Sequence, residues 1–269
     1  MSSFFQDKVV IVTGGSDGIG KAIIDLLIPM GANVATCGRN YDKLYQLELA
    51  YVGKPLHTMV ADVSSESDCR RFVETTLKVY GRIDILINNA GISMRALLKD
   101  LNPDVIRRVM DVNFFGAVYM TKYALSSLLE SKGAVIGVSS VAGYRGLPGR
   151  SGYSASKFAL QGWLEAIRTE LMADGVHVMW VCPGFTASNI RNAALTENGQ
   201  AQGESPLDEK SLMSAERCAA AILKAIEKRK RTLVLDGQGR QTIFLNKFFP
   251  SLTDKLVRNY YFKNGNLTK

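Results

Sequence analysis

Short apolar runs alternate with amphipathic segments along most of this chain, and this alternation restricts the fold more than any other feature of the sequence. The runs stay apolar at consecutive positions, as in strands that are buried on both faces. Strand and helix repeated in this way predict right-handed βαβ units on one parallel sheet. We therefore predict an α/β fold, a Rossmann-type doubly wound parallel sheet of about seven strands with helices on both faces. The predicted strands are 8–13, 33–38, 56–61, 83–88, 133–140, 176–182 and 231–236, and the predicted helices are about 18–29, 42–51, 66–80, 103–130, 153–173 and 214–228.

No segment has a convincing linker composition, so residues 1–269 are predicted to form a single Rossmann-type domain. The longest break in the pattern is 184–213, which is polar and rich in Asn, Gln, Glu and Ser. Long loops inside a compact domain are usually functional, so we predict that this segment is a substrate loop or lid. A basic and aromatic C-terminal tail, 241–269, follows the last predicted strand.

A glycine-rich turn joins the first predicted strand to the first predicted helix. Gly14, Gly18 and Gly20 are spaced G-x3-G-x-G in "VTGGSDGIGKA". Glycines at such a turn let the backbone approach a pyrophosphate, whose charge is bound by the free N–H groups at the helix start. No Gly-Lys-Ser/Thr follows, which argues against a nucleoside triphosphate site. The turn therefore predicts dinucleotide binding.

The end of the second predicted strand indicates which dinucleotide is preferred. A carboxylate there would bond the ribose hydroxyls of NAD, and a cation would pair with the 2′-phosphate of NADP. The sequence has Gly38 followed by Arg39, and a guanidinium binds phosphate well. Asp17 argues in the other direction, because it adds negative charge near the same phosphate. We predict NADP(H) as the preferred cofactor and keep NAD(H) as the alternative.

Tyr153 and Lys157 lie four residues apart in "SGYSASKF", inside a predicted helix. This spacing places the two side chains on one helix face. The pair is either an ordinary solvated surface pair or a proton donor whose pKa is lowered by a neighbouring cation. The pair alone does not distinguish these interpretations.

The chain resembles the short-chain dehydrogenases/reductases, in the branch with a Tyr-x-x-x-Lys motif. The matching motifs are "TGGSDGIG", "NNAG" (88–91), Asn113, Ser140, "YSASK" (153–157) and "PG" (183–184), in the order seen in that family. The resemblance runs from residue 8 to about 190, and Ser140 lies 13 residues before Tyr153 as in the family. It implies a Rossmann-type sheet, a nicotinamide cofactor and reversible carbonyl/alcohol chemistry.

The resemblance also assigns site residues. It implies Asn113, Ser140, Tyr153 and Lys157 as the catalytic set, with Asn113 holding a water in a proton relay to Lys157. Ser188 stands where the family often has threonine, and the hydroxyl is kept. With the residues of the turn and of the second strand end, the expected cofactor-binding residues are Gly14, Ser16, Asp17, Gly18, Ile19, Gly20, Arg39, Asp62, Val63, Asn89, Ala90, Gly91, Tyr153, Lys157, Pro183, Gly184, Phe185, Thr186 and Ser188.

Carbonyl reduction explains why these side chains would occur together. The reaction needs a hydride on carbon and a proton on oxygen, and a free tyrosine with pKa ~10 is a slow participant at neutral pH. A nearby ammonium favours the phenolate and lowers that pKa, and Lys157 can also bond the ribose. Ser140 can donate to the carbonyl oxygen. We predict an NADP(H)-dependent oxidoreductase that interconverts a ketone or aldehyde and an alcohol, with Tyr153 as acid/base.

Other functions are weaker interpretations. An NAD-dependent alcohol dehydrogenase remains the first alternative, and a nonenzymatic dinucleotide-sensing protein would have no need of the proton relay. A hydrolase would use "GVSSV" (137–141), but the second glycine of a nucleophile elbow is missing. The only candidate bases for it, His57 and His177, fall in or beside predicted strands.

The net charge of +8 is carried by one end of the chain. Residues 224–269 hold 11 Lys/Arg and 3 Asp/Glu, whereas the other 223 residues hold 22 of each sign. This distribution argues against a nucleic-acid surface spread over the fold. The run "EKRKRT" (227–232) is more typical of a solvated helix end, so we predict no nucleic-acid partner.

The substrate and the tail are less constrained by the sequence. Candidate pocket walls are Ser93, Met94, Tyr144, Leu147 and the 185–213 loop, which suggest an apolar carbonyl compound. The segment 242–265 interleaves aromatics with Lys and Arg and loosely resembles the tails of family members that act on steroids, retinoids or other lipids. We expect an apolar or lipid-like substrate and peripheral membrane contact through the tail. The alternative is a helix packed on its own domain or on a second subunit.

Assembly and location are further expectations. The resemblance implies a homodimer or homotetramer formed through the helices at about 103–130 and 153–173. No secretory signal is visible, and no apolar stretch reaches the ~18 residues of a spanning helix. Cys37, Cys69, Cys182 and Cys218 form no CxxC, which predicts neither metal nor disulfide use and favours a cytoplasmic location, with membrane association through the tail as an addition.

Overall fold

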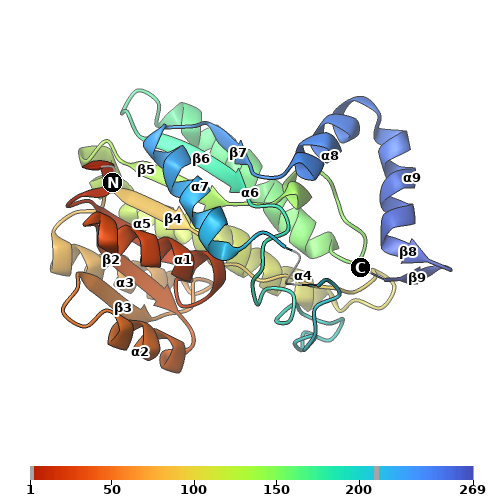
Figure 1. Ribbon diagram of the computed structural model, residues 1–269, viewed down its shortest axis with the longest axis horizontal. Coiled ribbons are helices and arrows are strands. Elements are labelled where there is room, and N and C mark those ends of the chain that lie inside the picture. Colours follow the sequence, from red (N-terminus) through yellow and green to blue (C-terminus); the bar gives the residue numbers. More distant parts are fainter. Residues whose placement is uncertain (1–2, 209–211, 269) are drawn as a thin grey trace.

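A seven-stranded parallel sheet forms the centre of the molecule (Figure 1). The computed structural model describes residues 3–208 and 212–268. The strand order is β3-β2-β1-β4-β5-β6-β7, and every neighbouring pair is parallel. This order confirms the predicted Rossmann-type sheet. The strands are β1 (Val9–Thr13), β2 (Asn33–Gly38), β3 (Leu56–Val60), β4 (Ile85–Asn88), β5 (Ala134–Val138), β6 (His177–Cys182) and β7 (Thr232–Val234).

Helices cover both faces of the sheet. Val10 and Val12 of β1 pack in one cluster with the first and seventh helices, and Ile11 packs in a second cluster on the other face. Because side chains alternate between faces along a strand, a run of consecutive apolar residues supplies both clusters. The helices are α1 (Gly18–Leu27), α2 (Tyr41–Ala50), α3 (Glu66–Tyr80), α4 (Pro103–Met110), α5 (Gly116–Glu130), α6 (Ser151–Glu170), α7 (Ala215–Glu227), α8 (Gly237–Phe248) and α9 (Pro250–Tyr261), with short 3-10 turns η1 (Ser3–Phe5), η2 (Ile28–Met30) and η4 (Val141–Gly143).

The helix predicted over 103–130 is divided in the structure. A π-helical turn, η3 (Asp111–Phe115), separates α4 from α5. A π-turn inserts one residue without ending the helix, so the sequence still reads as one continuous helical segment. Gly116 follows this turn and packs against Val63, where an added Cβ would lie 2.9 Å from the valine side chain. The turn and the glycine bring α5 close to the segment after β3.

The predicted basic tail folds as two helices and a short hairpin. α8 and α9 follow β7, and β8 (Phe262–Lys263) pairs antiparallel with β9 (Asn266–Leu267). Proline at the first position of α9 restricts Phe249, which accounts for the break between the two helices. Figure 1 shows α8 and α9 extending from the side of the molecule that is far from α2. None of the described helices, these two included, is long and apolar enough to cross a membrane.

The predicted lid, 184–213, contains no helix and no long strand among its described residues. An isolated bridge joins Met94 to Leu195 and ties the middle of the segment to the body of the fold. Another joins Thr186 to Met213, so the two ends of the segment lie side by side. Residues 209–211 of the predicted lid lie outside the described residues, as do 1–2 and 269 of the predicted single domain. The lid and the single domain both stay predictions.

Candidate active site

The carboxyl ends of the central strands open into one cavity of about 740 Å³. Parallel strands of an open α/β sheet end at the same edge, so segments far apart in the sequence meet there. Most of the predicted site residues line this cavity. They are Gly14, Ser16, Asp17, Gly18, Ile19, Arg39, Asp62, Val63, Asn89, Ala90, Gly91, Ser93, Ser140, Leu147, Tyr153, Lys157, Pro183, Gly184, Phe185, Thr186 and Ser188.

Two of the four predicted substrate-wall residues do not line the cavity. Met94 is fully buried in a small apolar cluster beside α4. The Tyr144 hydroxyl accepts a hydrogen bond from the Trp180 ring N–H at 2.9 Å. Both side chains therefore pack away from the cavity, and the predicted walls that reach it are Ser93, Leu147 and part of the 185–213 loop.

The glycine turn has the geometry of a dinucleotide site. Gly14 and Gly18 have φ of +66° and +52°, a region that favours glycine. A side chain at Gly20, which lies behind the turn rather than on the cavity wall, would collide with the Gly14 carbonyl. Asp17 accepts a hydrogen bond from the Gly18 N–H at 2.7 Å, caps α1, and forms an ion pair with Lys43. The closely packed turn before a helix N-terminus fits a bound pyrophosphate.

The segment after β4 is held against this turn by hydrogen bonds. The Thr13 hydroxyl accepts from the N–H groups of Asn89 and Ala90, at 3.0 and 2.9 Å. The Asn89 side chain donates to the carbonyls of Thr13 and Gly14, at 2.9 and 3.2 Å. Asn89 therefore positions the turn, which is a more specific role than the cofactor contact expected for it.

The end of β2 carries cations and no carboxylate. β2 ends at Gly38, and Arg39 and Lys43 after it both line the cavity. Arg39 Nη1 lies 3.8 Å from an oxygen of Asp62, a long and exposed ion pair that leaves most of the guanidinium accessible. This end of the cavity fits a negatively charged group.

Lys157 is a buried cation, 4% exposed. Its ammonium donates a hydrogen bond to the Val138 carbonyl at 2.9 Å, which aims the side chain at the end of β5. Burial lowers the pKa of Lys157 to about 8, because the charged form loses its water. The Lys157 Nζ lies 5.6 Å from the centre of the Tyr153 ring, so the helical spacing does bring the two side chains together.

The pKa of Tyr153 differs from the expectation. Burial raises it above the usual value for tyrosine, and a hydrogen bond with Ser140 and the charge of Arg150 lower it by less. The predicted lowering by a neighbouring cation is outweighed by desolvation of the phenolate, and the cations that lower this pKa are Arg150 and Arg191 rather than Lys157. Tyr153 is a neutral phenol at pH 7.

Ser140 is held by the turn that it begins. Its Oγ accepts a hydrogen bond from the Ala142 N–H at 3.1 Å and caps η4. Gln161 donates to the Ser139 hydroxyl at 2.8 Å and to the Ser140 carbonyl at 3.2 Å, which fixes the end of β5 against α6. Neither histidine lines the cavity, so the described residues offer Ser139 and Ser140 no imidazole base. This arrangement disfavours the hydrolase alternative.

Asn113 lies in the π-turn and acts from behind the cavity. Its amide donates to the Ile92 carbonyl and to the Ser156 hydroxyl, both at 2.9 Å, and accepts from the Ile92 N–H at 2.8 Å. These bonds join the segment after β4 to α6. The side chain therefore positions the residues that precede Ser93 and surround Lys157.

The sequence reasoning missed one whole wall of the cavity. This wall comes from the segment before α6 and from α8 and α9. The only sequence signal was the aromatic and basic character of the tail, which does not indicate where the tail packs. The missed residues on this wall are Arg150, Asp236, Gln238, Gly239, Thr242, Leu245, Thr253, Leu256, Val257, Tyr260 and Tyr261.

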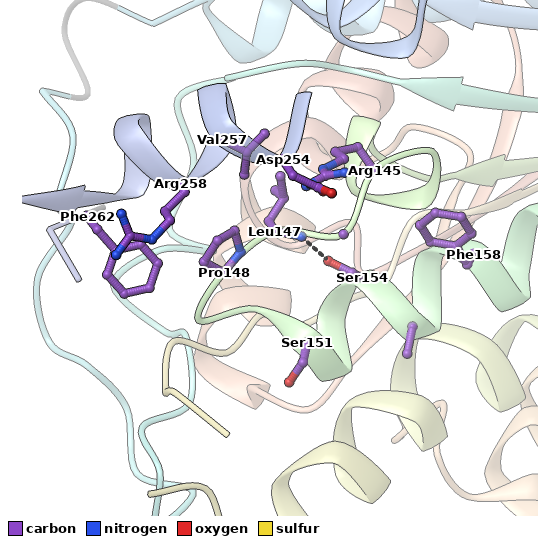
Figure 2. Close-up of a pocket in the computed structure, with 12 residues that line it drawn as sticks. Arg145, Leu147, Pro148, Ser151, Ser154, Phe158, Asp254, Val257, Arg258 and Phe262 are labelled. Carbon is purple, nitrogen blue, oxygen red and sulfur yellow. Dashed lines mark hydrogen bonds and ion pairs between the residues drawn. The ribbon is translucent and has the colours of Figure 1, made fainter. Parts of the chain in front are cut away.

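A second hollow of about 650 Å³ adjoins the cavity, between the segment 145–158 and α9 (Figure 2). Its lining is mostly apolar, with Pro148, Phe158 and Phe262 among the side chains. Leu147 and Val257 line both the hollow and the cavity. The wall between the two spaces therefore includes these two side chains.

The comparisons with known proteins agree with this geometry. The model of the short chain dehydrogenase family matches residues 8–199. Dehydrogenase/reductase SDR family member 7B of Bos taurus is 33% identical over 276 residues, covering 96% of this chain and 82% of that protein. An 11-beta-hydroxysteroid dehydrogenase A of Arachis hypogaea is 34% identical over 275 residues, with coverage of 97% and 77%. A solved short-chain dehydrogenase from Streptomyces avermitilis has a TM-score of 0.80 and 26% identity, over 96% of this chain and 100% of that one.

Proposed function

The chain belongs to the short-chain dehydrogenase/reductase family and is an oxidoreductase of the CH–OH/C=O pair, and from this premise we propose that it reduces a ketone or aldehyde with NADPH, using Tyr153 as the proton donor. The observation that carries the proposal is that Ser140, Tyr153 and Lys157 line the same cavity as the glycine turn. A bound NADPH supplies the hydride. The protein supplies the proton, the orientation of the carbonyl and the exclusion of water.

Each polar side chain at the reacting end has a separate role in this proposal. Ser140 donates a hydrogen bond to the substrate oxygen and holds it near the Tyr153 hydroxyl. Tyr153 transfers its proton to that oxygen as the alkoxide forms. The Lys157 ammonium stabilises the phenolate that is left and bonds the cofactor ribose. The buried position of Lys157 strengthens its electrostatic effect on the phenolate.

The protonation states support reduction as the direction of the reaction. Because burial raises the pKa of Tyr153, the phenol carries its proton at neutral pH and is ready to donate it. Lys157, with a pKa of about 8, is largely an ammonium at pH 7. Oxidation of an alcohol would need the phenolate and is expected to be faster at alkaline pH.

The end of β2 supports NADPH as the cofactor. Arg39 and Lys43 line the cavity there, and the strand ends in glycine rather than in an acidic residue. A 2′-phosphate would find the accessible Arg39 guanidinium, whereas the ribose hydroxyls of NADH would find no carboxylate at the end of this strand. Asp17, which argued against this preference, is neutralised by its ion pair with Lys43.

The test of the reaction is Tyr153→Phe, which removes the hydroxyl and keeps the ring. We expect turnover of a panel of apolar ketones and aldehydes to fall by about 10²–10⁴-fold, while NADPH binding stays within about twofold. Tyr144→Phe is the matched control, because that tyrosine lies outside the cavity, and it should keep most of the rate. A Tyr153→Phe enzyme with most of its rate would refute the assignment.

The cavity walls support an apolar or lipid-like substrate. Leu147, Leu245, Leu256 and Val257 line the side opposite the strands. The relative from Arachis hypogaea is named for a hydroxysteroid activity, which is an apolar substrate class. Such a substrate would partition into membranes, so the proposal includes contact between the tail helices and an anionic lipid surface.

Assembly and location form the remaining part of the proposal. Phe115 at the start of α5 and Phe158 on α6 are 40% and 46% exposed, and these helices are the ones through which a homodimer or homotetramer is expected to form. The four cysteines are buried free thiols, which fits a reducing, cytoplasmic location.

A further inference from the structure

Arg150 lies on the cavity wall without a partner. It directly precedes α6 and is three residues before Tyr153. Its guanidinium is partly buried, and its Nε atom is buried with no hydrogen-bond partner. No hydrogen bond or ion pair joins this side chain to any residue in the ranges 3–208 and 212–268. A buried donor that makes no hydrogen bond costs about 1–3 kcal/mol, so we expect a partner from outside the chain.

The carboxylates of the cavity are already engaged elsewhere. Three line it among the described residues, and each has a partner of its own. The pairs are Asp17 with Lys43, Asp62 with Arg39, and Asp236 with the Gly239 N–H at the start of α8. None of these carboxylates pairs with Arg150, so its positive charge has no ion-pair partner among the described residues of the cavity.

Arg150 lies near Tyr153, at the reacting end of the cavity, and near the tail helix α9. Its charge lowers the pKa of Tyr153, and it has the same effect on Tyr261 of α9. It therefore lies within electrostatic reach of both phenols. The phosphates of a dinucleotide belong at the glycine turn and the start of α1, where Arg39 and Lys43 also lie. The ligand that meets Arg150 is then the substrate.

We propose that the substrate is an apolar carbonyl or alcohol compound that carries an anionic group, and that the Arg150 guanidinium binds this group. The inference rests on the proposed oxidoreductase function of the same cavity and names its substrate class. Carboxylate and phosphate monoester are the two chemistries that a guanidinium binds with paired hydrogen bonds. The apolar body of such a compound would contact Leu147, Leu256 and Val257, which line the same cavity.

The test compares matched ligands that differ only in the head group. Octanoate, octyl phosphate and 1-octanol are titrated by calorimetry into the protein, with and without saturating NADP+. The wild-type protein should bind one of the anions at least about 10-fold more tightly than 1-octanol. In Arg150→Gln this preference should disappear, while 1-octanol binding should be unchanged. The stronger of the two anions identifies the chemistry of the head group.

Arg95→Gln is the matched control, because Arg95 also has a buried Nε without a partner but does not line the cavity. It should bind all three ligands as the wild type does. Equal binding of the anions and 1-octanol by the wild type would overturn the proposal, and so would an equal loss for all three in Arg150→Gln. These outcomes do not depend on turnover. Suppose that octanoate binding depends on Arg150 but that Tyr153→Phe leaves the reduction rate unchanged. The anion site would then be supported and the proposed reaction refuted.

Discussion

At the scale of single residues, Lys157 is a side chain that normally carries a positive charge in water but is buried here. It is 4% exposed and donates one described hydrogen bond, to the Val138 carbonyl. Burying an ammonium costs stability unless its partners compensate for the lost water. Burial therefore lowers the pKa of Lys157 to about 8. The free energy lost by burying the ammonium in the protein alone can be offset when the ribose and the phenolate become its partners.

The pH dependence of stability tests this burial. The unfolded lysine has a pKa near 10.5 and the folded one about 8, so between these values the unfolded chain binds more protons. Stability contributed by Lys157 should thus rise with pH above 8. Between pH 7 and 9.5, we expect the wild type to gain about 2 kcal/mol relative to Lys157→Met, measured by urea denaturation without cofactor. Lys78→Met, at an exposed site, is the control for replacement of a lysine by methionine. A pH-independent difference for Lys157→Met would mean that the ammonium is hydrated.

Cofactor preference is also expected to depend on single residues. Fluorescence titration at one ionic strength should give tighter binding of NADPH than of NADH. Arg39→Ala should weaken NADPH by about 10–100-fold, because a charge-assisted hydrogen bond is lost, and should leave NADH unchanged. Arg70→Ala is the control, since Arg70 pairs with Glu74 on α3 outside the cavity. Equal or NADH-favoured binding would instead support NAD-dependent alcohol oxidation, and binding of neither would contradict the cofactor proposal.

Which site residues the sequence reveals depends on whether their partners are local. Tyr153 and Lys157 are four apart on one helix, so spacing alone places them together. Ser140 becomes identifiable only through the family motif. Arg150 has no local signal, because its position is a loop–helix junction and its expected partner is not part of the chain. The predicted lowering of the Tyr153 pKa was wrong for a related reason. Burial raises this pKa, and the burial depends on tertiary packing that the sequence does not show.

At the scale of elements, Arg145 connects both tail helices to the rest of the fold. It donates to Asn246 of α8 at 3.0 Å and forms an ion pair with Asp254 of α9 at 2.6 Å. Asn246 in turn donates to the Tyr144 carbonyl at 2.9 Å. Figure 2 shows Arg145 and Asp254 together at one side of the hollow beside α6. One side chain, itself 16% exposed, therefore bonds to both helices.

Arg145→Ala should loosen the tail without unfolding the sheet. Loss of two charge-assisted hydrogen bonds should speed amide hydrogen exchange in α8 and α9 by about 10–100-fold and leave β1 and β4 unchanged. Substrate KM should rise, because both helices line the cavity. Arg231→Ala, which removes an exposed pair with Glu165, is the control and should leave exchange in α8 and α9 as it was. Unchanged exchange in Arg145→Ala would show that apolar packing alone positions the tail.

Elements were predictable where burial made them regular. The seven strands lie within about two residues of their predicted ends, because strands buried on both faces give unbroken apolar runs. The division of 103–130 was missed because a π-turn preserves the pattern on either side of it. The helices α8 and α9 were not predicted as separate elements, because several of their aromatic residues face solvent and the segment reads as an interleaved aromatic and basic tail.

At the scale of the whole molecule, charge and exposed apolar surface gather on the same two helices. Phe244 and Phe248 of α8 are 56% and 57% exposed and lie with ring centres 4.9 Å apart. Lys247 lies over the Phe248 ring, and Lys255 and Arg258 follow on α9. The sequence indicated the charge of this region, but not that the region also forms a wall of the cavity. A lipid-facing surface beside the cavity would give an apolar substrate a short path to the reacting groups.

Vesicle co-sedimentation tests this surface. Removing the tail at residue 240 would cut α8 and open the cavity, so substitutions are the better probe. The wild-type chain should pellet with phosphatidylserine vesicles and less so in 0.5 M salt, where ionic attraction is screened over about 4 Å. Phe244→Gln with Phe248→Gln should reduce binding by at least about 10-fold, since a buried phenylalanine contributes about 1.5–3 kcal/mol. Met172→Gln, at another exposed apolar site, should pellet like the wild type. Negligible pelleting of the wild type would refute membrane contact. If the wild type instead self-associates regardless of salt, and the double variant does not, the surface binds a second copy of the chain.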